Sequence, residues 1–175
     1  LIGFVTVLSA YPYWVSQSEA IPEFFSLILF AAFGMVTMVM TTQLLVFVLG
    51  LEIMSLSLYA LVGLRRYDPS SGEAAFKYFL LGSVATAFLL LGVSFFYGAT
   101  GTLDMARIPQ TLAHPEMATI FKLGSLLILL GFAFKVGAVP FHFWAPDAHD
   151  GAPMPVTGFM ATGVKVAAFG SLIRV

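Results

Sequence analysis

The chain has 175 residues, of which 59% are hydrophobic and only 10% are charged, and its formal net charge is −1. Soluble domains carry about 25% charged residues, so this composition excludes an ordinary water-soluble globule. The near-zero charge gives no basis for nucleic-acid binding, and the lack of cysteine excludes disulfides, thiolate metal sites and iron–sulfur ligation.

Hydrophobic segments follow one another along the chain and predict an all-α, multi-pass membrane protein with about six transmembrane helices. Roughly 20 mainly apolar residues suffice for a helix to cross a bilayer. Only three residues separate the second and third segments, which predicts a tight antiparallel pair. The longest loop is expected at 104–116. The segments cover about 1–14, 24–40, 44–64, 74–97, 119–144 and 156–175.

The two ends of the sequence predict that it continues in both directions. Leu1 is not a methionine, and Val175 stands inside a hydrophobic run. We therefore expect the chain to be an internal part of a longer polypeptide.

Ionisable residues lie inside the apolar segments, where a charge is costly. Glu52 is near the middle of the third segment, Lys135 is in the fifth, and Lys165 is near the middle of the sixth. A central charge opposes insertion by about 2.5–3.5 kcal/mol, so such residues usually face the bundle interior and pair with one another. One acid and two bases in these positions predict a proton relay. A purely structural ion pair that fixes helix registry is the alternative.

Lys77 lies near the start of the fourth segment, close to the membrane interface. A lysine there can extend its ammonium group to the interface or fix helix registry through an ion pair. It can equally belong to the polar path, and both interpretations stay open.

The fifth segment contains a predicted helix break beside its lysine. Pro140 lacks an N–H group and clashes with the carbonyl four residues earlier, and Gly137 weakens the helix further. Broken membrane helices line cavities or water, so we expect the break to hydrate Lys135. His142, with an ordinary pKa of about 6.5, could pass protons from Lys135 to Lys165. The alternative for His142 is a hydrogen-bonded loop residue.

No other catalytic pattern is present, such as a glycine-rich nucleotide loop or a nucleophile with its base. Asp147, His149 and Asp150 place metal-binding atoms in one short stretch. Their spacing matches no specific metal site, so we expect no metal.

Four stretches together resemble the antiporter-like N-type subunits of proton-pumping NADH:quinone oxidoreductase, respiratory complex I. The resemblance extends from about residue 24 onward. The stretches are "LEIMSLSLYALVG" (51–63), "EAAFKYFLLG" (73–82), "FYGATGTL" (96–103) and "LGFAFKVGAVPFHFWAPDAHDGAPMPVTGFMATGVKVAAF" (130–169).

The resemblance implies a fold and a set of site residues. Antiporter-like subunits contain two inverted repeats of five helices, each with a broken helix. Residues 24–175 would form the first repeat, and residues 1–23 would be the end of a preceding helix and its loop. In that family the residues matching Glu52 and Lys135 form a pair. Lys165 would continue the hydrophilic axis, and Lys77 would be a polar element beside the pair.

The resemblance also implies a membrane-embedded, proton-translocating subunit without a redox centre. NAD, FMN, iron–sulfur clusters and quinone would be bound by other subunits. The partners would be other membrane subunits, including neighbouring antiporter-like ones, in an energy-transducing membrane such as the bacterial plasma membrane. Two alternatives remain: a subunit of a multi-subunit cation/proton antiporter, and a structural membrane subunit.

Overall fold

The computed structural model describes residues 1–16, 22–111 and 118–174, and within these ranges it contains helices and no strand. Parts of the predicted link before residue 24 and of the loop at 104–116 lie outside the described residues, as does Val175. The elements are α1 (Ile2–Ser16), α2 (Pro22–Met40), α3 (Leu44–Val62), α4 (Pro69–Thr100), α5 (Ile108–Thr111), α6 (Ala118–Val136), α7 (Ala145–Gly151), α8 (Met154–Phe159), the π-helical turn η2 (Met160–Val164) and α9 (Lys165–Leu172).

The predicted all-helical membrane fold is confirmed. Four of the described helices, α2, α3, α4 and α6, are long and apolar enough to cross a membrane. The sixth predicted segment corresponds to α8, η2 and α9, which follow one another without a gap. Within the fifth predicted segment, 119–144, α6 ends at Val136, directly before the predicted break residues Gly137 and Pro140.

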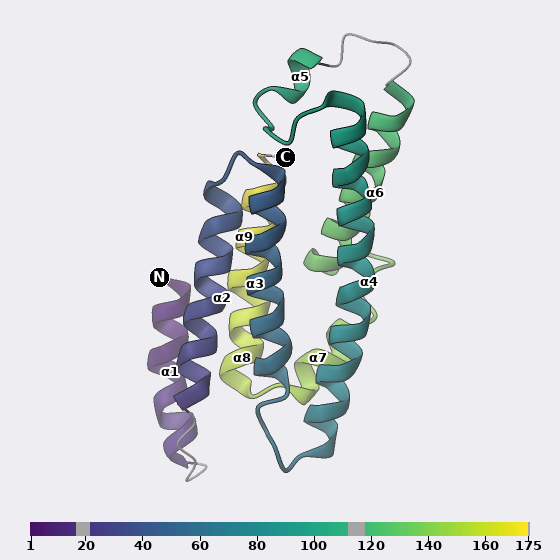
Figure 1. Ribbon diagram of the computed structural model, residues 1–175. Helices are drawn as coiled ribbons and strands as arrows, with labels where there is room; N and C mark the ends of the chain where they lie inside the picture. Colours follow the sequence, from purple (N-terminus) through teal and green to yellow (C-terminus); the bar gives the residue numbers. More distant parts are fainter. Residues whose placement is uncertain (17–21, 112–117, 175) are drawn as a thin grey trace.

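The helices form two groups that lie side by side (Figure 1). In one group, α2 and α3 are an antiparallel pair, α9 lies against α2, and α1 lies at the outer edge, where it contacts α8 and α2. In the other group, α4 lies along α6 and α7. The short α7 lies near the end of the bundle that carries the loop between α3 and α4 (Figure 1). The predicted tight pairing of the second and third segments is therefore observed.

Pairs of glycines allow both antiparallel pairs to pack with their backbones close together. A Cβ on Gly50 of α3 would lie 2.9 Å from the carbonyl oxygen of Gly34 in α2. A Cβ on Gly92 of α4 would lie 2.7 Å from the carbonyl oxygen of Gly124 in α6. Small residues at such crossings are how membrane helices gain close van der Waals contact.

The long helix α4 has clear sequence signals at both ends. Asp68 is its N-cap and accepts a hydrogen bond from the backbone nitrogen of Ser70 at 3.0 Å, and Pro69 occupies the first helical position. Gly101, with φ of 66°, ends the helix in the left-handed conformation. The helix is therefore longer at both ends than the predicted 74–97, because the apolar run covers only its middle.

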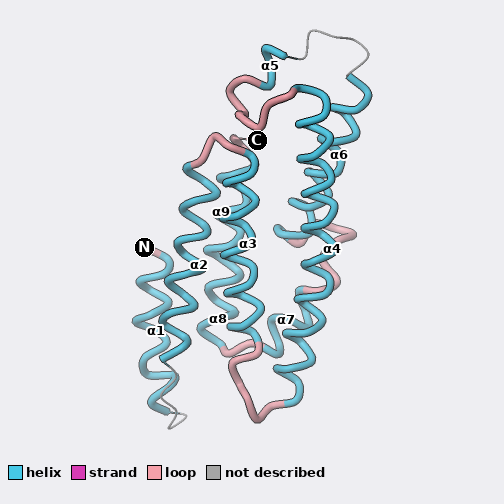
Figure 2. The backbone as a smooth tube through the Cα atoms, viewed as in Figure 1, coloured by secondary structure: helices cyan, strands magenta, loops and turns pink. Residues whose placement is uncertain are grey.

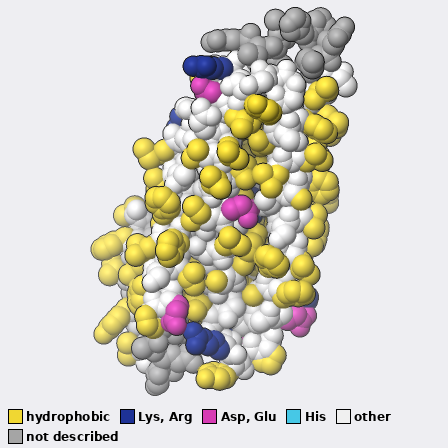
Figure 3. Space-filling model, in the orientation of Figure 1, with side chains coloured by type: hydrophobic (Ala, Val, Ile, Leu, Met, Phe, Trp, Pro, Cys, Tyr) yellow, Lys and Arg dark blue, Asp and Glu magenta, His cyan; other side chains and the backbone are white. Residues whose placement is uncertain are grey.

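Charge and apolar surface are separated along the molecule. Figure 3 shows hydrophobic side chains over the middle of the visible face and charged side chains gathered at its ends, with an acidic group at mid-height. The end clusters include the ion pairs of Arg66 with Glu23 and of Arg107 with Asp104. This distribution is typical of a protein whose middle lies in lipid.

Candidate functional site

The break after α6 is built by Gly137, three residues before the proline that the sequence singles out. Gly137 has φ of 70°, and its N–H donates to the carbonyl of Phe134 at 3.1 Å. The next N–H, of Ala138, donates to the carbonyl of Ala133 at 2.8 Å. These two bonds form a Schellman motif, the usual way for a helix to end at a glycine. Pro140 follows in the loop and does not itself interrupt helical backbone.

An aromatic stack holds the loop after the break. Trp144 donates its indole N–H to the carbonyl of Phe134 at 3.0 Å and stacks on Tyr78 with ring centroids 4.6 Å apart. Tyr78 in turn contacts the ring of Tyr59 edge-on at 4.7 Å. The loop therefore lies beside the middle of α4, where Figure 2 shows it in pink between α6 and α7.

Lys135 lies in the last turn of α6 and is only 3% exposed. Its ammonium Nζ donates to Ser55 Oγ at 2.7 Å and, over a longer distance of 3.4 Å, to Tyr59 Oη. Nζ also lies 5.7 Å from the centroid of the Tyr59 ring, within the range of a cation–π contact. A buried charge requires such partners, because an unsatisfied one would cost several kcal/mol.

Glu52 lies on α3, one turn before Ser55, and is half-buried. Its Oε1 accepts a hydrogen bond from Thr86 Oγ1 of α4 at 2.7 Å. None of the ion pairs among the described residues joins Glu52 to Lys135. The two residues predicted as a pair are thus bound to hydroxyl groups, Glu52 to that of Thr86 and Lys135 to those of Ser55 and Tyr59.

Lys77 lies away from this centre, in an exposed cluster near the start of α4. Its Nζ forms ion pairs with Glu73 at 2.7 Å and with Asp147 of α7 at 3.2 Å. All three side chains are about half exposed or more. In this structure Lys77 joins α7 to α4, which agrees with the interpretation of Lys77 as an ion-pair residue.

Lys165 is exposed and is the first residue of α9, directly after the π-helical turn η2. Single π-turns inside helices occur frequently at functional sites. His142 is exposed in the loop after the break, and no hydrogen bond or ion pair among the described residues joins its ring to Lys135 or Lys165.

His149 in α7 is the histidine whose pKa is affected by the charge of Lys165. Burial, followed by the charge of Lys165, lowers the pKa of His149 below its ordinary value. Its ring lies edge-on to Trp144, with centroids 6.2 Å apart, and its carbonyl accepts from Thr157 Oγ1 at 3.0 Å. The sequence gives His149 no role, because the neighbourhood of Lys165 depends on how α9 packs.

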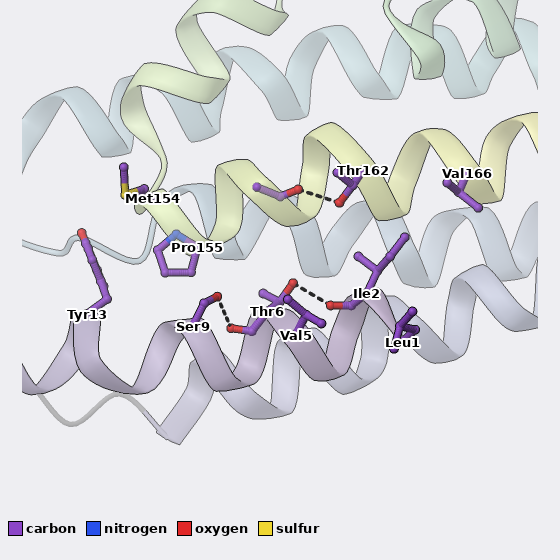
Figure 4. A pocket seen from close by; sticks show the side chains of 11 residues that line it. Leu1, Ile2, Val5, Thr6, Ser9, Tyr13, Met154, Pro155, Thr162 and Val166 are labelled. Atoms are coloured by element: carbon purple, nitrogen blue, oxygen red, sulfur yellow. Dashed lines mark hydrogen bonds between the residues drawn. The ribbon is translucent and has the colours of Figure 1, made fainter.

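An apolar groove of about 660 Å³ lies between α1 and the run from α8 to α9 (Figure 4). The hydroxyl groups of Thr6, Ser9 and Thr162 in its lining each donate to a carbonyl of their own helix. The surface of the groove is therefore mainly apolar, because these hydroxyl groups are already hydrogen-bonded within their own helices. None of the ionisable residues named above lines it.

Sequence reasoning did not identify Ser55, Tyr59 and Thr86. A signal for the first two exists, because Glu52, Ser55 and Tyr59 follow one another at i, i+3 and i+7 and so share one face of α3. Thr86 carries no such signal, since its contact with Glu52 depends on the packing of α4 against α3.

Residues 41–175 match the transmembrane family of NADH:quinone oxidoreductase and Mrp antiporter proteins. The chain belongs to this family. The match covers most of the chain, including each of the predicted proton-transfer residues.

The relatives that this family member resembles include NADH-quinone oxidoreductase subunit N proteins. It is 51% identical over 158 residues to NADH-quinone oxidoreductase subunit N 1 of Sorangium cellulosum, covering 87% of this chain and 31% of that protein. It matches a chain of respiratory complex I from Thermus thermophilus with a TM-score of 0.80 and 41% identity, covering 99% of this chain and 39% of that chain. The chain thus spans about a third of the length of the curated relatives that it matches.

A second branch of the family is also similar in structure. The chain matches the Mrp complex of Dietzia sp. with a TM-score of 0.71 and 27% identity, covering 85% of this chain and 28% of that chain. The family membership, the apolar helices and the complex I relatives together identify an integral, multi-pass membrane protein.

Proposed function

We propose that the chain is part of a proton-translocating membrane subunit of NADH:quinone oxidoreductase. The observation that carries the proposal is 51% identity to a subunit N protein, combined with a buried lysine in the last turn of a broken helix. Residues 24–175 form the first of two five-helix repeats in this proposal. Electron transfer takes place on other subunits, which bind NAD, FMN, iron–sulfur clusters and quinone.

Protons move along an axis formed by Glu52, Lys135 and Lys165. When Glu52 and Lys135 are paired, the carboxylate holds the ammonium group charged. When the pair opens, the low polarity around Lys135 favours release of its proton toward Lys165. An opposite charge within about 4–6 Å changes a pKa by roughly 1–3 units, which is enough to gate such a step. Redox-driven changes in neighbouring subunits would open and close the pair.

The test is NADH-driven acidification of inverted membrane vesicles that contain the full-length subunit with Lys135→Ala. Acidification should fall at least about tenfold, which corresponds to about 1.4 kcal/mol or more, because the buried ammonium group of the proposed proton path is removed. Assembly of the complex is checked on a native gel from the same preparation. Normal acidification in an assembled Lys135→Ala complex would exclude Lys135 from the proton path.

The second candidate function, a cation/proton antiporter subunit, is favoured by the similarity to the Mrp complex. It predicts proton movement driven by a sodium or potassium gradient in vesicles that receive no NADH. The third, a purely structural subunit, predicts that neutralising Glu52 or Lys135 abolishes assembly rather than pumping by an assembled complex.

A further inference from the structure

The two central ionisable residues are bound by hydroxyl groups, and no ion pair among the described residues joins them. Thr86 on α4 donates to the Glu52 carboxylate at 2.7 Å, while the Lys135 ammonium is bound by Ser55 and Tyr59. A carboxylate and an ammonium one helical turn apart would otherwise attract each other strongly in a medium of low polarity. The hydroxyl groups therefore offer each ion an alternative partner.

A glycine on the facing helix leaves the space that the Tyr59 hydroxyl group occupies. A Cβ on Gly82 of α4 would overlap the hydroxyl group of Tyr59. Tyr59 is 7% exposed, and its ring is fixed by edge-on contacts with Tyr78 and Phe79 at 4.7 and 5.8 Å. The phenol is thus held with its hydroxyl directed between α3 and α4, within reach of the Lys135 ammonium.

Ser55 acts differently from the other two hydroxyl groups. Its Oγ donates its own proton to the carbonyl of Leu51 at 2.6 Å and so presents a lone pair to Lys135. Because Ser55 stands between Glu52 and Tyr59 on the same face of α3, Lys135 can keep this contact while it turns toward either neighbour. Ser55 is then a pivot that both arrangements share.

We propose that Thr86 and Tyr59 are positioning residues that stabilise the separated arrangement of Glu52 and Lys135. The inference rests on the proposed proton axis and adds residues that set how often its central pair is open. Removal of either hydroxyl group favours the closed pair, in which Lys135 retains its proton. Thr86 binds the acid and Tyr59 binds the base, and both contacts favour the separated arrangement over the paired one.

The experiment compares Thr86→Val and Tyr59→Phe in the full-length subunit of the assembled complex. Both changes remove only a hydroxyl group and keep the side-chain shape. NADH-driven acidification, normalised to assembled complex, should fall about three- to tenfold in each, the factor for a lost hydrogen bond of ordinary strength. The alkaline limb of the pH–rate profile should move to higher pH, because a paired ammonium gives up its proton less readily.

Two matched variants separate positioning from packing. Tyr78→Phe removes a buried phenol hydroxyl from the same ring stack and should pump like the wild type, because Tyr78 contributes its ring to the stack. Thr86→Ser keeps a hydroxyl group and should restore most of the activity that Thr86→Val loses. If either Thr86→Val or Tyr59→Phe fails to assemble, the other variant still tests the positioning role, because the two residues lie on different helices.

The outcomes distinguish this inference from the proposed function. If Lys135→Ala abolishes acidification while Thr86→Val and Tyr59→Phe behave like Tyr78→Phe, the positioning role is wrong and the proton axis stands. If Lys135→Ala leaves acidification intact, the axis is wrong and the positioning role falls with it. A reduced rate with a displaced alkaline limb in both hydroxyl variants supports the inference.

Discussion

His149 shows how a single residue reports on the packing around it. Burial and the nearby Lys165 both disfavour its charged form, so its pKa is lower than in an unfolded chain. The acidic residues that share α7 with His149 are Asp147 and Asp150, and Asp147 is already paired with Lys77 of α4. Protonation of His149 must therefore overcome both burial and a neighbouring ammonium group.

This arrangement predicts a pH-dependent stability. The unfolded chain binds a proton at His149 below about pH 6.5, whereas the folded chain binds it only at lower pH. Stability contributed by neutral His149 is therefore complete above pH 6.5 and is lost as the pH falls through the folded pKa. His149→Gln should lessen the decrease in thermal stability of the purified complex between pH 7 and pH 5. An unchanged decrease would show that other groups cause it.

At the scale of the elements, close helix crossings fix the rotation of α4 and α6 and so the direction of their side chains. The backbones of α4 and α6 meet at Gly92 and Gly124. Lys135 lies three turns beyond Gly124 on α6, on the part of the helix that reaches Ser55 of α3. A displacement at the crossing is therefore transmitted to the lysine.

Gly92→Ala should destabilise the purified complex by about 1–3 kcal/mol, because its Cβ would lie 2.7 Å from a backbone oxygen that cannot easily move. Gly98→Ala on the same helix is the matched control, since a Cβ there meets nothing within 4 Å. The control should be neutral or stabilising by up to about 1 kcal/mol through helix propensity. Thermal unfolding in detergent measures both. Equal effects of the two changes would argue against a close crossing.

At the scale of the whole molecule, one arginine joins the two groups of helices at their shared end. Arg65, in the loop after α3, donates from Nη2 to the carbonyl of Asp150 at 3.0 Å and to that of Gly151 at 2.8 Å. These carbonyls lie at the end of α7, so Arg65 joins α7 to the first group. Lys77 and Asp147 hold the other end of α7 to α4.

Arg65→Ala should release α7, and its backbone amides should exchange with deuterium faster in the assembled complex. Arg66→Ala is the control, because Arg66 forms an exposed ion pair with Glu23 far from α7 in sequence, and such pairs contribute at most about 1 kcal/mol. Exchange measured by mass spectrometry on peptides covering 141–153 distinguishes the two variants. Identical exchange would mean that α7 is held without the contacts of Arg65.

The sequence predicts the helical membrane fold, because apolar length is a local feature. The end of α6 can also be predicted from the sequence, because "FKVGAVP" has a lysine in the last turn, a glycine after it and a proline beyond. The partners of Glu52 and Lys135 could not be predicted, because Thr86 and Tyr59 meet them only through helix crossings between distant segments.

The glycine cap after α6 has an electrostatic consequence for the lysine beside it. The aligned peptide dipoles of a helix place about half a negative charge at its C-terminus, and α6 has its C-terminus beside Lys135 in the interior of the protein. A continuous helix would carry that partial charge away to the membrane surface. The break thus supplies the ammonium group with a fixed counter-charge made of backbone, which remains in place whether the Glu52 carboxylate is near or far.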